Sequence, residues 1–193
     1  GYVVAEEKLP VKTATKAMYD LGQLASFEDI MVEDNTSTLT LSTSKFTAVF
    51  NKTAGYLSSY TYDGVQLITK PLRLNVFRLP TDNDGSKRES WDNMGLRSLT
   101  ASGKGVEFEK SADGKTVNVA LNTRYTGKNS TAFDVQMNFL VCANGVMMVN
   151  SFIKPTSTGA ILPKICFRLE MPAEMEQLTW FGRGPWDSYR DRQ

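Results

Sequence analysis

The sequence contains few of the side chains that enzymes use for proton transfer and nucleophilic attack. Its 193 residues include no histidine, which excludes Ser-His-Asp and Cys-His catalysis and removes the commonest zinc ligand. Carboxylates therefore remain the main candidates for acid and base chemistry. Three pairs of acidic residues lie close together in the sequence: Asp82 with Asp84, Glu174 with Glu176, and Asp187 with Asp191.

None of these pairs has a pattern that favours catalysis over structure. Asp82 and Asp84 could share one face of a strand at a separation of about 7 Å. Aspartate and asparagine ahead of a glycine such as Gly85 are, however, typical of turns, where their side chains accept backbone N–H groups. The second pair fits a solvated face, and the third lies among arginines that favour ion pairs. We therefore expect no catalytic residue in this chain.

The composition argues against several other classes of site. Cys142 and Cys166 lie in apolar stretches and are expected to be buried free thiols. Two cysteines without histidine predict no metal site. The formal net charge is +1 and no basic stripe stands out, so nucleic acid is not an expected partner. No apolar run approaches the roughly 20 residues that span a bilayer, so no membrane segment is expected.

Apolar residues recur at every second position, which is the period of a β-strand with one buried face. The alternating stretches lie at 39–41, 106–108, 117–121 and 133–141. Turn-forming residues lie between the expected strands at Lys52–Gly55, Asp63-Gly64, Asp113-Gly114 and Asn144-Gly145. The pattern predicts an all-β antiparallel fold of many short strands, either a β-sandwich or an open barrel.

One long polar segment, residues 79–99, interrupts the strand pattern. A short helical turn is expected around Arg88–Trp91, and Gly95 argues against a long helix. A connection of about 20 residues inside a compact domain is unusual and is more often functional than not. The chemistry-bearing residues of this segment are therefore the first candidates for a site.

Two motifs carry a resemblance to a known family. Phe77–Gly85 (FRLPTDNDG) resembles the Arg-x-Pro-x-Asp-Asn-Asp motif of the large bacterial β-galactosidases of glycoside hydrolase family 2. Residues 180–192 (WFGRGPWDSYRDR) are similar to that family's second signature, although Asp187 stands where glutamate is usual and Trp186 where a polar residue is common. The residues expected to hold these motifs together are Arg78, Pro80, Trp180, Gly182, Arg183, Gly184, Pro185, Asp187, Tyr189, Asp191 and Arg192.

The resemblance implies a supersandwich similar to galactose-mutarotase-like domains, incomplete at its C-terminus because the family's region continues past Gln193. Residues 1–16 are expected to be the last strand of an immunoglobulin-like domain or a connector, 17–27 a linker, and 28–193 the N-terminal part of the small-chain domain. In the family the catalytic acid and nucleophile lie in a preceding barrel, and other domains bind magnesium and sodium. No cofactor is therefore expected in this chain, and its compartment, cytoplasmic or periplasmic, stays open.

In family members the segment after the first motif closes over bound sugar. By resemblance, Gly85 is the expected hinge and Ser86–Met94 the body of this lid, since closure needs a residue that absorbs a large backbone change. The expected substrate-binding residues are Asp82, Asn83, Asp84, Gly85, Ser86 and Trp91. The alternative is an ordered surface loop without a substrate role. Trp180, Trp186 and Tyr189 either stack on sugars or pack against other domains.

The resemblance implies a non-catalytic part of an enzyme that hydrolyses terminal β-galactosides. This part is expected to buttress the barrel and to supply the lid. The alternatives are a free-standing carbohydrate-binding module and a purely structural or oligomerisation domain. The longer enzyme is expected to be a homo-oligomer, and this chain is expected to dimerise through exposed strand edges.

Overall fold

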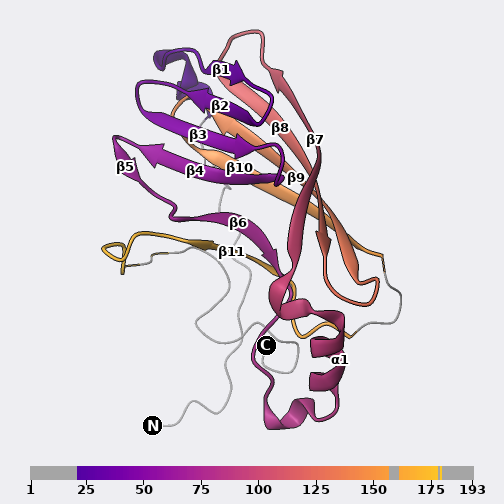
Figure 1. The fold of residues 1–193 in the computed structure, drawn as a ribbon. Helices are drawn as coiled ribbons and strands as arrows, with labels where there is room; N and C mark the ends of the chain where they lie inside the picture. The colour runs from indigo at the N-terminus through magenta and orange to yellow at the C-terminus, as the bar shows by residue number, and fades with distance from the viewer. Residues whose placement is uncertain (1–20, 157–160, 178, 180–193) are drawn as a thin grey trace, which may run out of the picture.

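A computed structural model describes residues 21–156, 161–177 and 179, and Figure 1 shows them as β-sheets with a short helical segment at one end. The first sheet has the order β1 (Met31–Asp34), β2 (Thr38–Ser42), β3 (Phe46–Asn51), β4 (Tyr56–Tyr62), β5 (Val65–Gln66). The second has the order β10 (Met147–Pro155), β9 (Ala132–Cys142), β8 (Thr116–Thr126), β7 (Thr100–Lys110). A two-stranded pair joins β11 (Cys166–Glu170) to β6 (Lys70–Asn75).

The helical elements are short. They are the 3-10 helices η1 (Leu21–Ser26), η2 (Asp82–Asp84) and η3 (Leu96–Ser98), and the α-helix α1 (Lys87–Met94). The helical turn expected around Arg88–Trp91 is therefore confirmed in position, but it extends to an eight-residue helix that ends at Gly95. Among the described residues, no helix has both the length and the apolar character needed to cross a membrane.

Every described strand pair is antiparallel, and the predicted turns join neighbouring strands in the sheets. Asp63 and Gly64, at φ 45° and 77°, connect β4 to β5, and both adopt the positive φ of a tight hairpin. The Asp113-Gly114 and Asn144-Gly145 turns connect β7 to β8 and β9 to β10. The local turn chemistry therefore sets which strands pair.

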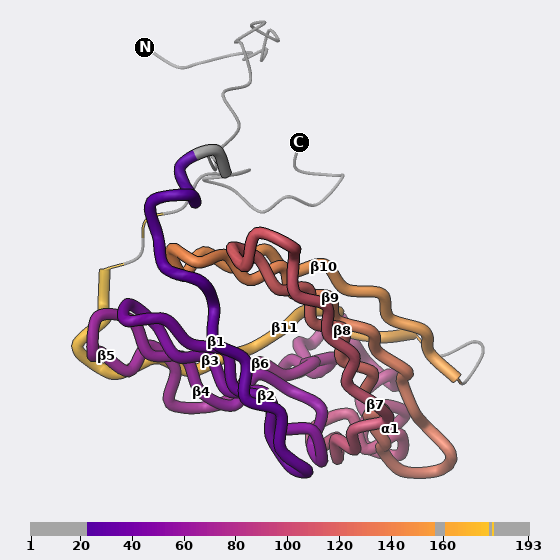
Figure 2. Tube along the Cα trace, turned by 90° about the horizontal axis from the view of Figure 1, so that it is seen from above, coloured from indigo at the N-terminus to yellow at the C-terminus, as the bar shows by residue number. Residues whose placement is uncertain are grey.

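The two sheets face each other across a continuous apolar core, which confirms the predicted all-β sandwich. Figure 2 shows the sheets as separate layers. The inward residues of β8 and β9 alternate along each strand, as the sequence predicts. Phe50 of β3 meets Phe139 of β9 edge to face, with ring centroids 5.1 Å apart. Such a pair adds about 0.5–1.5 kcal/mol beyond the burial of its area.

Among the described residues, the last two strands lie at sheet edges. β10 and β11 each end a sheet order. Six large apolar residues of this part of the chain are exposed: Val149, Phe152, Ile161, Ile165, Leu169 and Met171. Open edges with apolar side chains are surfaces on which another strand or chain can pair. The expected dimerisation stays a prediction.

The two cysteines differ from each other. Cys142 is buried in β9, as expected. Cys166 is only half-buried, so the expectation of a second buried thiol is wrong. The reason is its place on the outer strand β11, where its Sγ lies 3.4 Å from the Asn75 carbonyl oxygen. Both thiols are free.

Candidate functional site

The chain leaves the sheets after β6 and enters the polar segment that the first motif marks. Figure 1 places α1 at the lower end of the molecule, beyond the end of β6. Val76 is fully buried and fixes the start of the segment. The Arg97 guanidinium lies 4.7 Å from the ring centroid of Phe77, so residues near the two ends of the segment are in contact.

Arg78 and Asp84 form a bidentate ion pair inside this segment. The Arg78 nitrogens lie 2.7 and 2.9 Å from the two Asp84 carboxylate oxygens. The same carboxylate accepts the Thr81 backbone N–H at 2.6 Å and the Thr81 hydroxyl at 3.1 Å. The hydrogen bonds from Arg78, followed by the Thr81 backbone N–H, hold the pKa of Asp84 well below its usual range. Asp84 is therefore an ionised carboxylate that closes a turn, which is the structural role weighed for it above.

Trp91 is the second buried residue of the segment. Its side chain is 2% exposed, and its indole N–H donates to the Ile161 carbonyl oxygen at 2.9 Å. The Arg78 guanidinium lies 5.4 Å from the Trp91 ring centroid. Arg78 thus contacts both the Asp84 turn and the helix. In this conformation the Trp91 ring packs in the interior, and its contact with a sugar stays a prediction.

The other predicted substrate-binding residues lie on the surface. Asp82, Asn83, Gly85 and Ser86 are all exposed, and they form the turn that leads into α1. Gly85 has φ 48° and ψ −127°, a backbone conformation that only glycine adopts easily. The structure therefore separates the six predicted residues into four exposed ones and two packed ones, Asp84 and Trp91.

Sequence reasoning missed several partners of this site. Thr81 stands three positions before Asp84, the spacing of a capping box, so a local signal for it was present. The Ile161 carbonyl had no such signal, because it lies 70 positions from Trp91. Pro80, which was among the predicted motif residues, is half-buried and lies between Arg78 and Asp84 in the sequence.

The candidate acidic residues that the structure describes have the surroundings of turn and surface residues. Asp82 is exposed while Asp84 is paired with Arg78, and Glu174 and Glu176 are exposed. Within the described ranges, no three His, Cys, Asp or Glu side chains come together as a metal site would require. The remaining predicted residues lie outside the described part of the chain: Trp180, Gly182, Arg183, Gly184, Pro185, Trp186, Asp187, Tyr189, Asp191 and Arg192.

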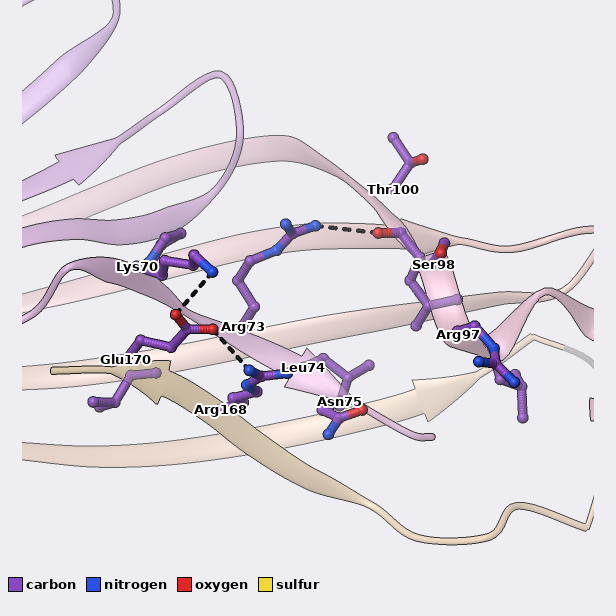
Figure 3. A pocket seen from close by; sticks show the side chains of 13 residues that line it. Lys70, Arg73, Leu74, Asn75, Arg97, Ser98, Thr100, Arg168 and Glu170 are labelled. Atoms are coloured by element: carbon purple, nitrogen blue, oxygen red, sulfur yellow. Dashed lines mark hydrogen bonds and ion pairs between the residues drawn. The ribbon is translucent and has the colours of Figure 1, made fainter. Parts of the chain in front are cut away.

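An open groove of about 470 Å³ lies between β6, β11 and the start of β7 (Figure 3). Four cations line it, but each already has a partner. Lys70 and Arg168 lie 2.8 and 2.7 Å from Glu170. Arg73 donates to a backbone carbonyl at 3.1 Å, and Arg97 stacks on an aromatic ring. This network ties β6 to β11, so the groove is a structural junction and residues 78–94 are the better candidate site.

Comparison with known proteins gives the same family as the two motifs. Residues 42–193 match the family described as beta galactosidase small chain. The chain is 32% identical to a beta-galactosidase of Priestia megaterium, a match that covers all of this chain and 18% of that protein. Beta-galactosidases of Halalkalibacterium halodurans and Clostridium acetobutylicum are each 27% identical over 76% of this chain, which corresponds to 15% and 16% of their lengths.

The chain therefore spans less than a fifth of the length of these relatives. The family match includes the Arg78–Asp84 turn, α1 and every strand from β3 to β11. This match covers most of a sandwich of the predicted class. The chain belongs to the β-galactosidase small-chain family.

Proposed function

We propose that this chain is a non-catalytic part of a longer β-galactosidase, in which it buttresses the catalytic barrel and supplies a lid over the bound galactoside. The named relatives, all beta-galactosidases and all much longer, support a domain of such an enzyme. Of the candidate acidic residues that the structure describes, Asp84 is paired with Arg78, and Asp82, Glu174 and Glu176 are exposed, whereas a retaining glycosidase needs two facing carboxylates about 5 Å apart. In this proposal, the catalytic groups and any bound magnesium or sodium come from other domains.

The observation that carries the lid is the contrast within residues 78–94. The Arg78–Asp84 pair and the buried Trp91 fix two points. Between them lies an exposed stretch, residues 85–90, that begins at a glycine with φ 48°. A short exposed segment with a glycine at its base has the form of a loop that opens and closes over a ligand.

Hydrolysis of an aryl β-galactoside tests the assignment to a longer enzyme. We expect turnover by the full-length protein that contains this chain and none by residues 1–193 alone. Turnover by residues 1–193 would overturn the proposal, because the active carboxylates would then lie within them.

A glycine substitution tests the lid. Gly85→Ala leaves its new methyl group in open space, with no atom within 4 Å, but places an L-residue at φ 48°. Such strain costs about 1–3 kcal/mol and shifts the population of loop conformations. We expect kcat/KM of the full-length enzyme to change by about tenfold, since 1.4 kcal/mol is a factor of ten.

Gly64→Ala is the matched control. Gly64 also has positive φ, 77°, and also has no atom within 4 Å of the new methyl group, but it lies in the β4–β5 turn. Both variants therefore carry a similar backbone strain. If they change kcat/KM equally, or if Gly85→Ala changes nothing, residues 85–90 are an ordered surface loop.

We also propose that the open edges of β10 and β11 take part in oligomer contacts of the longer enzyme. The support is the exposed apolar set around Phe152 and Leu169. Light scattering on residues 1–193 at high concentration tests the dimer expected of this chain. A monodisperse monomer would count against it.

A further inference from the structure

The two ends of α1 are held very differently. The last carbonyls of an α-helix have no partner within the helix and must find one elsewhere. Here the turn between β8 and β9, residues 127–131, supplies two of the partners. The Lys128 backbone N–H donates to the Met94 carbonyl at 2.8 Å, and the Asn129 side-chain amide donates to the Asn93 carbonyl at 2.8 Å.

The same turn packs closely against the end of the helix. A methyl group on Gly95 would lie 2.8 Å from the Lys128 side chain and 2.9 Å from its backbone nitrogen. A methyl group on Gly127 would lie 2.3 Å from the Met94 carbonyl oxygen. The two backbones thus approach each other at a distance that only glycine allows.

The turn adopts a costly backbone conformation in making this contact. Asn129 and Ser130, neither of them glycine, have φ of 48° and 62°. Such residues persist in this region only where surrounding contacts hold them there. Here those contacts include the Thr131 N–H bond to the Lys128 carbonyl at 2.9 Å and the Asn129 bond to the helix.

Among the described residues, none gives the N-terminal end of α1 comparable support. Its N-cap residue, Ser86, makes no side-chain capping hydrogen bond. The first-turn residues 87–90 are all exposed. An uncapped first turn with exposed residues favours fraying from this end.

We propose that the β8–β9 turn anchors the lid to the sandwich by holding the C-terminal half of α1, with Asn129 as a positioning residue. This turn is called the mount below. Only Gly85–Ser90 then moves over the substrate, while Trp91–Gly95 stays attached to the sandwich. This inference rests on the proposed lid function and narrows the moving part, which the family resemblance extends to Met94. Asn129 does not contact the substrate. It acts by holding the C-terminal half of α1, from Trp91 to Met94, in place against the β8–β9 turn.

Asn129→Asp in the full-length enzyme tests the mount. Aspartate has the same shape and also tolerates positive φ, but its carboxylate has no N–H to donate and faces the negative end of the helix dipole. We expect hydrogen exchange in peptides spanning 91–95 to become about fivefold faster, which is the loss of one ordinary hydrogen bond. Asn129→Gly removes the same donor without adding charge and is expected to behave in the same way.

Ser130→Gly is the control, because it relieves a positive φ in the same turn and keeps the Asn129 amide. It should leave exchange at 91–95 unchanged. Unchanged exchange in both Asn129 variants would overturn the mount.

Aryl galactoside kinetics separate the mount from the lid. If the lid proposal holds, both Asn129 variants raise KM about fivefold, while Ser130→Gly leaves KM at the wild-type value. Faster exchange with unaltered KM and kcat would support the proposed mount but contradict the proposed lid.

Discussion

The sandwich core and the 78–94 segment are stabilised by different forces. The core is a two-layer apolar contact in which inward residues of β3, β8 and β9 are almost completely buried. The segment buries Trp91 and otherwise depends on directional contacts: the Arg78–Asp84 ion pair, the indole bond to Ile161 and the caps from residues 127–131. Apolar burial is non-directional and sums over large areas, whereas each polar contact contributes only about 0.5–1.5 kcal/mol.

Because of this difference, the core is the rigid part of the chain and the 78–94 segment is the part that can change conformation. A core held by many mutual contacts opens only with global unfolding, while a segment held by a few hydrogen bonds opens locally. A lid needs the second kind of stability on a support of the first kind. Three substitutions test the comparison, from the largest expected effect to the smallest.

Phe139→Ala probes the core. It removes a fully packed ring that contacts Phe50 across the two sheets, and such a change costs about 3–5 kcal/mol. Chemical denaturation should show this loss in the free energy of unfolding. Met31→Ala, at a residue 63% exposed on β1, is the control and should change it by less than about 0.5 kcal/mol. Equal losses would contradict a core that depends on the contact between Phe139 and Phe50.

Asp84→Asn probes the segment, and its effect should depend on pH. Because Arg78 lowers the pKa of Asp84 in the folded state, the pair stabilises the fold above the unfolded pKa of about 4. That contribution is lost as pH falls below about 4 toward the lower folded pKa. The variant should therefore unfold more easily than wild type at pH 7, and the difference should shrink in acid.

Thermal unfolding from pH 7 to acid measures this convergence. Asp82→Asn, at an exposed carboxylate two positions away, is the control and should follow wild type throughout. A constant gap between Asp84→Asn and wild type would contradict a contribution from the ionised pair. The loss should be smaller than for Phe139→Ala, because the Arg78 side chain is partly exposed.

Tyr60→Phe probes a single polar contact on the core side. The Tyr60 hydroxyl donates to the Gly145 carbonyl and so ties β4 to the β9–β10 turn. Its loss should cost about 1 kcal/mol. Burial, followed by the nearby Tyr62, raises the pKa of Tyr60 to about 12. The contribution is therefore complete below pH 10 and is lost as pH rises through 12.

Spectrophotometric titration measures this phenol directly. The wild-type protein should show a tyrosine that ionises near pH 12 and is absent from the variant. If the variant instead lacks a tyrosine that ionises near pH 10, the Tyr60 hydroxyl is open to solvent.

Much of the fold follows from local patterns. Alternation along 133–141 predicted β9, and the Asp-Gly and Asn-Gly pairs predicted hairpins that the structure confirms. These signals are local because side chains alternate along every strand and because tight turns need positive φ. The motif at Phe77–Gly85 likewise marked the segment that contains the candidate site. The length of α1 was underestimated, since Gly95 ends the helix without preventing its first two turns.

The sequence by itself determined the strands, the turns, the family and the absence of histidine chemistry. Only the tertiary structure decided which candidates point inward, because that depends on contacts between residues far apart in the chain. Trp91 finds its acceptor at Ile161, 70 positions later, and Asn129 reaches back 36 positions to the end of α1. No periodicity or local spacing encodes such pairs, since they form only when two sheets have already placed separate segments side by side.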